Sequence, residues 1–517
     1  MFVPSQRLIG EISALLALLS CGLLHLERTR RHAVPGWLIR GISGAILVFA
    51  VATFFHFGRL PGQGFYHRAE MFHYFLGAKY APELGYTHLY ECAAVAEADG
   101  VHDSRVAGRQ LRDLRDDSLR SGASVLSHPE TCTARFTPTR WLAFKTDLTW
   151  FRRDMGERAW RNALLDHGYN PSPVWTIAGR GLASLGPASG GLLQALAFID
   201  PLLMLGTIAA LYWGFGPRVA VLAALFWSTQ SPADFDFTGG GLLRQDWLFL
   251  AAIGLSALRR QRPFLAGVAL SWAGLLRVFP LLLLAAPALA VLGHLARERR
   301  FRRSDLRFAS GVLLACGLLL PLGRLAAGPG AYRDFALHIG MHARSPIINH
   351  VSLRTIFLAE PWAPAVAPQA DPALADRAWA DSRRARLSRV EWPLRGAQVF
   401  GCALFVACAW PLRRTWVATS LAVPLIFVLT DPSAYYYSVW VLLLPLVRVW
   451  RPLELVVMAV AAAGQLLSLR YPMPSSRFFG MSVLYGGSAL LLFARFAWTG
   501  VGKLLAEDPH HEEVEPK

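Results

Sequence analysis

The chain has 517 residues, of which 54% are hydrophobic, and its mean hydropathy is +0.35. Long apolar runs recur from end to end, which excludes a soluble globular protein and predicts a polytopic membrane protein. The formal charge of +17 would suit a nucleic-acid-binding protein. The basic residues lie mostly in short clusters between apolar runs, however, where they set membrane orientation, so we expect no nucleic acid as a partner.

The apolar runs predict an all-α fold, a polytopic transmembrane helical bundle with about thirteen spans. Arginine clusters separate several of the runs and fall on one side if the spans alternate, and the positive-inside rule makes that side the cytoplasm. The runs lie near residues 9–26, 37–58, 191–213, 217–231, 246–258, 264–277, 279–296, 307–326, 397–411, 416–430, 435–449, 453–468 and 478–498.

This threading divides the chain into six parts, two of which are long loops on the extracytoplasmic side. Loops of such length usually carry function. We expect two N-terminal spans in 1–58, the first extracytoplasmic loop in 59–190, a central transmembrane bundle in 191–326, the second extracytoplasmic loop in 327–396, a C-terminal bundle in 397–498 and an acidic cytoplasmic tail in 499–517.

The first long loop has structure of its own. Residues 104–122 predict a short charged helix, and residues 140–169 predict an amphipathic helix with apolar residues at three- and four-residue steps. The amphipathic helix either lies in the membrane interface, as helices rich in Trp and Arg can, or packs on the rest of the loop. Cys92 and Cys132 share this loop, and they can form a disulfide if it is extracytoplasmic.

The stretch "FYHRAEMFHYFLGAKY" (65–80) follows the second apolar run and combines ionisable groups with aromatic ones. It is either a solvated loop at the water interface or a reaction site that faces the membrane. Its candidate site residues are His67, Arg68, Glu70, His73 and Lys79.

A short loop further on, "ADFDFTGGGLLRQDW" (233–247), contains a D-x-D pair. Asp234 and Asp236 have a spacing that could chelate a divalent cation, although a solvated loop is the simpler interpretation. Arg244 and Asp246 flank the next span, where Arg244 either pairs with Asp246 or helps to bind an anionic group.

Arg277 interrupts an apolar stretch that is too long for one span and is flanked by basic clusters on both sides. The stretch therefore predicts a hairpin with Arg277 at its tip. Each leg is about 20–25 Å long as a helix, less than the hydrocarbon thickness of about 30 Å, so we expect Arg277 inside the protein. A guanidinium there suits a phosphate, and the alternative is a snorkelling arginine paired with a carboxylate.

The second long loop opens with "HIGMHARSPIINHVSLRTIF" (338–357). His338 and His342 are spaced four residues apart, as in a helical metal site, but two histidines leave a ligand set short. We favour hydrogen bonding to a polar substrate or phosphate, with His342, Arg344 and Asn349 as candidates.

Four segments together resemble the C-type (GT-C) glycosyltransferase superfamily, and within it the bacterial polyprenyl-phosphate-sugar-dependent, mannosyltransferase-like branch. The segments are "FYHRAEMFHYFLGAKY", "GVALSWAGLLRVFPLLLL" with its tip arginine, "SPIINHVSLRTI" and "AYYYSVWVLLLPL". The resemblance covers most of the chain in layout, through short motifs. The chain departs from the branch in an extra first span, a longer first loop, and a Glu where Asp is commoner.

The resemblance implies a membrane enzyme of the bacterial plasma (inner) membrane with its site facing the periplasm. It would transfer a hexose, with inversion, from a polyprenyl-phosphate donor to a glycan or lipid acceptor. Glu70 takes the position of the family's general base and Arg277 that of its hairpin-tip cation, with Arg244 and Arg344 as helpers at the donor phosphate. No nucleotide-binding glycine motif is present in the sequence, and we expect no cofactor.

Two other function classes remain open. A transporter or lipid flippase predicts repeated halves and paired broken helices, whereas the sequence has no repeat of fixed period. A non-catalytic envelope-assembly protein would use the loops to bind partners, and changing Glu70 would then cause no loss of transfer.

Overall fold

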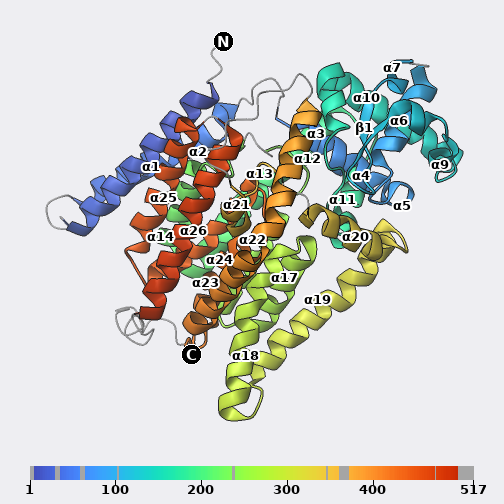
Figure 1. Cartoon of the computed structure of the whole chain (residues 1–517). Coiled ribbons are helices and arrows are strands. Elements are labelled where there is room, and N and C mark those ends of the chain that lie inside the picture. The colour runs from blue at the N-terminus through green and yellow to red at the C-terminus, as the bar shows by residue number, and fades with distance from the viewer. Residues whose placement is uncertain are drawn as a thin grey trace.

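The computed structural model describes residues 5–29, 35–58, 65–101, 104–235, 239–344, 347–359, 372–471 and 473–498. Within this part of the chain the fold is almost entirely helical, and a single two-stranded sheet is the exception (Figure 1). Eight of the described helices are long and apolar enough to cross a membrane. The protein is therefore a multi-pass membrane protein of the helical-bundle class.

The bundle combines the N-terminal, central and C-terminal apolar helices. The first part supplies α1 (Gln6–Thr29) and α2 (Gly36–Phe54). The central part supplies α12 (Gly190–Ala197), α13 (Ile199–Phe215), α14 (Pro217–Thr229), α16 (Asp246–Arg259), α17 (Pro263–Leu276), η3 (Phe279–Leu284), α18 (Ala285–Glu298) and α19 (Arg303–Ala327). The last part supplies α22 (Pro372–Ala409), α23 (Thr415–Leu421), α24 (Val423–Leu429), η4 (Ala434–Arg448), α25 (Leu453–Arg470) and α26 (Pro474–Trp498).

Every apolar run predicted as a span is helical in the structure, but the helices differ in length. Several, such as α14 and α17, are shorter than a full span. The extra first helix, α1, packs along α25. Close approach of α17 to α19 depends on glycine, because a Cβ atom on Gly267 or Gly311 would collide with a backbone carbonyl of the other helix.

The first long loop folds into a helical cap, defined here as residues 65–188, at one corner of the molecule (Figure 1). Its elements are α3 (Arg68–Met71), the π-helical η2 (Phe72–Leu76), α4 (Gly77–Lys79), α5 (Ala81–Leu84), α6 (Leu89–Val101), α7 (Ser104–Ala107), β1 (Gln110–Arg112), β2 (Leu119–Ser121), α8 (Gly122–Leu126), α9 (Glu130–Thr133), α10 (Pro138–Ala163) and α11 (Pro173–Ala183).

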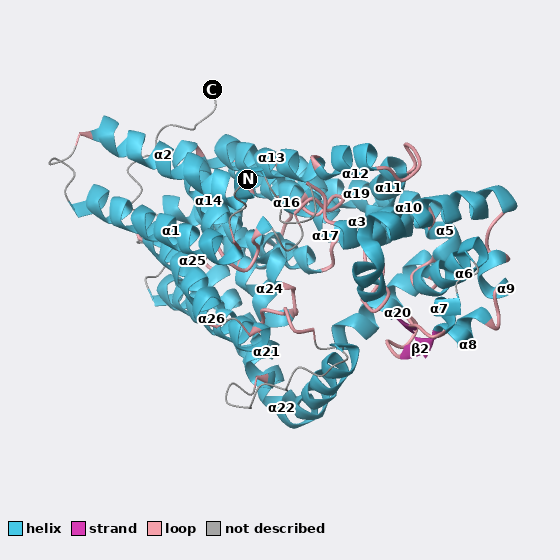
Figure 2. Cartoon of the chain, turned by 90° about the horizontal axis from the view of Figure 1, so that it is seen from above, coloured by secondary structure: helices cyan, strands magenta, loops and turns pink. Residues whose placement is uncertain are grey.

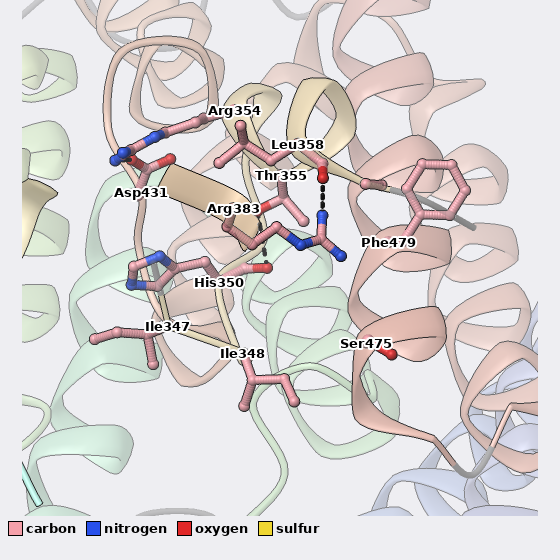
Figure 3. Close-up of a pocket in the computed structure, with 11 residues that line it drawn as sticks. Ile347, Ile348, His350, Arg354, Thr355, Leu358, Arg383, Asp431, Ser475 and Phe479 are labelled. Atoms are coloured by element: carbon pink, nitrogen blue, oxygen red, sulfur yellow. Dashed lines mark hydrogen bonds and ion pairs between the residues drawn. The ribbon is translucent and has the colours of Figure 1, made fainter. Parts of the chain in front are cut away.

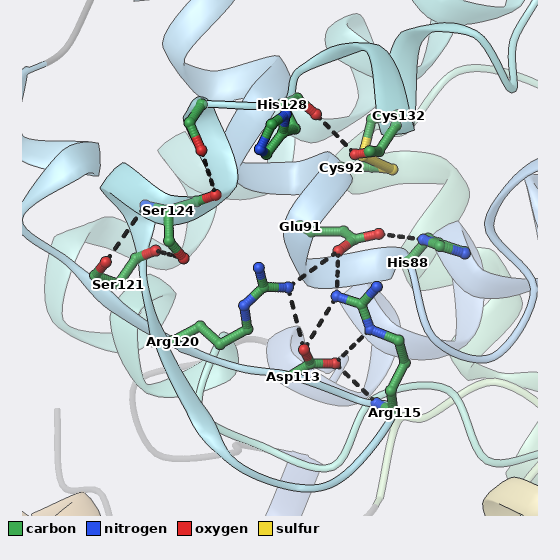
Figure 4. A network of polar contacts seen from close by, with 12 residues as sticks. His88, Glu91, Cys92, Asp113, Arg115, Arg120, Ser121, Ser124, His128 and Cys132 are labelled. Carbon is green, nitrogen blue, oxygen red and sulfur yellow. Dashed lines mark hydrogen bonds and ion pairs between the residues drawn. A yellow bond between two sulfur atoms is a disulfide. The ribbon is translucent and has the colours of Figure 1, made fainter.

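The prediction of one charged helix over 104–122 is wrong. Only α7 is helical there, and β1 and β2 form an antiparallel hairpin in which Leu111 pairs with Arg120. Asp113 near its turn accepts hydrogen bonds from Arg115 and Arg120, and Arg115 also reaches Glu91 of α6 (Figure 4). The charges of this segment are thus used in ion pairs across a hairpin, which a helical periodicity does not reveal.

The interfacial placement of the amphipathic helix is also wrong, because protein covers its apolar face. Phe144, Phe151 and Trp160 of α10 are fully buried against the cap. The prediction that Cys92 and Cys132 can pair is confirmed, since a disulfide joins α6 to α9 (Figure 4).

The second long loop contains α20 (Ala331–Arg344) and α21 (Leu353–Leu358). The long helix α22 then continues without a break across the expected loop boundary at residue 396 and into the bundle. In the view from above, α20 lies beside the cap, and α22 lies at the bottom of the view, below α24 (Figure 2).

Candidate functional site

A cavity of about 680 Å³ lies between the cap and the bundle. This volume falls within the range of small-molecule sites, about 300–1,000 Å³. Its walls come from η2, from the ends of α17 and α24, and from α20, α22 and η4, segments that are far apart in sequence (Figure 2). We call it the central cavity.

Arg277 lines the central cavity, and the hairpin predicted around it is confirmed in form. Helix α17 ends at Leu276, Arg277 is extended (φ −138°, ψ 132°), and η3 and α18 lead away. The residue is only 7% exposed. Its guanidinium carbon lies 5.8 Å from the ring centres of both Tyr74 and Trp175. Among the described residues its Nε and Nη2 atoms have no hydrogen-bond partner.

That last feature bears on the two interpretations of Arg277. A snorkelling arginine paired with a carboxylate would have its donors occupied, whereas two buried N–H-bearing atoms of Arg277 have no hydrogen-bond partner among the described residues, and the residue lines the central cavity. Unsatisfied buried donors are costly. The arrangement therefore favours an anionic ligand that completes the hydrogen bonding.

Glu70 and Arg244 form an ion pair, with 3.2 Å between Glu70 Oε2 and Arg244 Nη2. The Arg244 guanidinium carbon lies between the rings of Tyr74 and Tyr435, 4.6 and 4.8 Å from their centres, and Nη1 donates to the Tyr74 hydroxyl. The backbone N–H of Arg244 donates to the Asp200 carboxylate at 2.8 Å. Both tyrosines line the central cavity, so the ion pair lies one layer of side chains behind its wall.

Local structure orients the Glu70 side chain toward Arg244. His67 caps α3 by accepting the Glu70 backbone N–H on Nδ1, at 3.2 Å. The π-helical turn of η2 follows directly and brings Tyr74 to the cavity wall. Turns of this kind are frequent at functional sites. Burial lowers the pKa of His67, which matches its role as a neutral acceptor.

The second long loop supplies His342 and Arg344, two of the candidate site residues, to the lining of the central cavity. His342 lies near the cap, with its ring centre 5.3 Å from that of His167 and 6.5 Å from that of His338. Burial lowers the pKa of His342 to about 3 and that of His338 to about 4. No group of three or more His, Cys, Asp or Glu in the described residues could hold a metal ion.

Arg354 and Asp431 also line the cavity, and the sequence reasoning did not select them. Arg354 Nη1 lies 2.8 Å from Asp431 Oδ2, and the Ser352 hydroxyl donates to Asp431 Oδ1 at 2.6 Å. Figure 3 shows this pair close to His350, whose backbone forms an isolated antiparallel bridge with Ser433. Two short polar segments, around residues 350–354 and 431–433, are thus joined although they are far apart in sequence. The opposite charges of Arg354 and Asp431 were the one feature of the sequence that could have indicated this contact.

Three other predicted site residues have partners inside the cap and do not line the central cavity. Arg68 Nε donates to Asp154 at 3.0 Å, and the buried His73 hydrogen-bonds the Tyr90 hydroxyl at 2.8 Å through Nε2. Lys79 Nζ lies 2.8 Å from Asp147 Oδ2. These side chains hold the cap together.

The remaining candidates lie elsewhere. The backbone carbonyl oxygen of Asn349 accepts the Ala434 backbone N–H at 2.8 Å, and Asn349 does not line the central cavity. Asp234 lines a separate cavity of about 330 Å³ beside α1 and α25. Asp236, the other half of the D-x-D pair, lies outside the described residues.

Comparison with known proteins found no matching family model, no matching curated protein and no matching solved structure. The fold and the cavity by themselves define a multi-pass helical membrane protein with a cavity between its bundle and its cap that is lined by both charged and apolar residues.

Proposed function

We propose that this protein is a membrane glycosyltransferase that transfers a hexose from a polyprenyl-phosphate donor to a glycan or lipid acceptor, in a bacterial plasma membrane with the cavity open to the periplasm. One observation carries the proposal: the buried Arg277 lines a cavity of substrate size, and two of its guanidinium nitrogen atoms have no hydrogen-bond partner among the described residues. A phosphate is the anion that a forked guanidinium binds best.

The lining of the central cavity has an apolar part and a charged part, as a polyprenyl-phosphate donor would require. Leu276, Val278 and Phe279 stand beside Arg277 and offer an apolar wall to a hydrocarbon chain. Arg344 adds positive charge to the lining from the second long loop, whereas the charge of Arg354 is already paired with Asp431. An amphipathic ligand, with a phosphate and a sugar joined to a hydrocarbon chain, would match both the charged and the apolar part of the lining.

In the proposed reaction an acceptor hydroxyl oxygen attacks the anomeric carbon of the hexose as the bond from that carbon to the phosphate oxygen breaks. The proton passes to a carboxylate base, for which we propose Glu70, and the electron pair stays on the leaving phosphate, which Arg277 stabilises. A single displacement inverts the anomeric centre. Because Tyr74 and Arg244 stand between Glu70 and the cavity, the role of Glu70 requires these side chains to shift when the acceptor binds.

The test is a transfer assay on the purified full-length protein with radiolabelled polyprenyl-phosphate hexoses. We expect Glu70→Gln to reduce turnover by about 10²–10⁴-fold, the usual contribution of a general base. We expect Arg277→Gln to reduce it by about 10²–10³-fold through lost charge stabilisation. The controls are Glu130→Gln and Arg158→Gln, two exposed cap residues, which should retain wild-type turnover.

Two results would contradict parts of this proposal. Full turnover by Glu70→Gln would remove Glu70 as the base while leaving the transferase in place. Wild-type protein that binds the donor lipid, as seen by mass spectrometry, but transfers no hexose to any acceptor fraction would point instead to a transporter or flippase.

A further inference from the structure

A second polar cavity, of about 340 Å³, lies at the end of the bundle opposite the cap. It is formed where three helix connections meet: α16 to α17, α18 to α19, and α22 to α23. Figure 1 shows α18 reaching this end, far from the cap. We call the cavity the arginine pocket, after Arg259, Arg302, Arg413 and Arg414 in its lining.

Positive charge dominates this pocket. Asp305 is the one carboxylate among the described residues that line it, and it already accepts from His294 Nδ1 at 3.0 Å and from the Arg302 backbone N–H at 3.0 Å. The Arg302 side chain is paired with Glu298, outside the lining. The described lining thus contains four arginines and one carboxylate, and that carboxylate already accepts two hydrogen bonds.

The pocket also has an apolar side that continues onto the outside of the bundle. Pro263 and Val291 belong to the lining. Their sequence neighbours Phe264 and Leu292 are 45% and 53% exposed on the outward faces of α17 and α18, where a membrane helix meets lipid. Trp416, within 5.8 Å of the Arg259 guanidinium carbon, closes the inner side with a cation–π contact.

We propose that the arginine pocket binds the phosphate of an anionic membrane lipid, with the acyl chains lying along α17 and α18. Basic pockets between helices at the cytoplasmic face are suited to such headgroups, and this end is the one that the arginine clusters predict to be cytoplasmic. A free phosphate would use the same cations but would leave the apolar side without a partner. The inference does not depend on the proposed transferase activity.

The experiment titrates the full-length protein in neutral detergent with phosphatidylglycerol, phosphatidylcholine or inorganic phosphate and measures binding by native mass spectrometry. We expect phosphatidylglycerol to bind preferentially. The variant Arg413→Gln/Arg414→Gln should weaken its binding roughly thirtyfold, the effect of removing two cations. The control Arg303→Gln/Arg307→Gln removes the same charge from exposed positions at the same end of α19 and should change binding less than about threefold.

Four outcomes would overturn the inference: equal binding of the two lipids, equal weakening by both double variants, displacement of phosphatidylglycerol by equimolar inorganic phosphate, or a gain in binding when the acidic tail is neutralised. The last would mark the tail as the occupant, and Glu512→Gln/Glu513→Gln/Glu515→Gln tests it. Arg413→Gln alone, at an exposed position, keeps the test valid if the double variant fails to fold.

Discussion

At the scale of single residues, the same residue types have different roles according to whether partners surround them. Arg277 is buried beside a cavity and has two donor atoms without a partner in the described part of the chain, whereas Lys79 is buried with its charge paired to Asp147. The charge of a residue and its position along the chain do not tell a ligand-binding cation from a structural one. The atoms around the charged group distinguish the two, because a buried charge that is already paired has no capacity left for a ligand.

We predict that Lys79 stabilises the cap and does not bind substrate. Asp147 accepts from Lys79, from the Tyr80 hydroxyl at 2.8 Å and from the Ala188 backbone N–H at 2.7 Å. Lys79→Met should lower the free energy of unfolding by about 3–5 kcal/mol, because it leaves a buried carboxylate without its cation. Denaturant unfolding in detergent measures this.

The control for this prediction is the exposed pair of Lys145 with Asp99, 2.8 Å apart. Lys145→Met should change stability by no more than about 1 kcal/mol, as surface pairs usually do. If Lys79→Met kept wild-type stability and instead raised the KM for donor or acceptor, the structural role would be wrong.

At the scale of elements, the cap depends on long-range ties between short helices. Its helices α3, α5, α7 and α9 have only four residues each, too few to be stable in isolation. The burial of α10 and the disulfide between α6 and α9 hold them in place. The cap is therefore an element whose stability comes from tertiary contacts.

We predict that Cys92→Ala/Cys132→Ala destabilises the cap by about 4 kcal/mol, the loop-closure entropy for a separation of 40 residues. Limited proteolysis should then cut between residues 104 and 137 faster than in the wild type, while the bundle stays intact. Cys316→Ala, which removes a free cysteine of α19, should leave the cleavage rate unchanged. Equal cleavage rates in all three proteins would contradict the prediction.

At the scale of the whole molecule, the second long loop joins the cap to the bundle through three histidines, of which His338 and His350 are buried. His338 hydrogen-bonds Asn170 Oδ1 of the cap at 2.6 Å through Nε2, and His342 faces His167 of the cap. His350, near Asp431 of the bundle, has a pKa lowered by burial to about 4. These histidine side chains are therefore neutral when the cap and the bundle are packed together.

This arrangement predicts stability that is lost in acid. The pKa of His338 falls from 6.5 in the unfolded chain to about 4 in the fold, so the unfolded state binds more protons between these values. The contribution of His338 to the free energy of unfolding is greatest above about pH 6.5. It decreases as the pH falls toward 4, by on the order of 3 kcal/mol. Thermal unfolding in detergent from pH 8 to 4 measures it.

His338→Gln should flatten this dependence on pH, because no proton is taken up at the site. His128→Gln, at a largely exposed position of the cap, should follow the wild-type curve. A wild-type unfolding temperature that stays constant between pH 7 and 4 would show that these histidines do not control the junction.

The sequence by itself determined the class of the protein and much of its layout. Apolar runs place the bundle helices because the burial of apolar side chains in lipid depends on composition along the chain. The hairpin at Arg277 followed from the same reasoning, since the stretch is too long for one span and both of its flanks are basic. These are local properties, and a single sequence contains them.

Tertiary structure alone decided which polar residues share a cavity. Arg277, Arg344 and Asp431 are far apart in sequence, and they meet because the hairpin, α20 and the start of η4 pack around one hollow. In the same packing, Arg68, His73 and Lys79 have their partners inside the cap, and Glu70 lies behind Tyr74. The physical reason is that ion pairs and hydrogen bonds depend on distances of a few ångströms between segments, and residue spacing along the chain does not encode these distances.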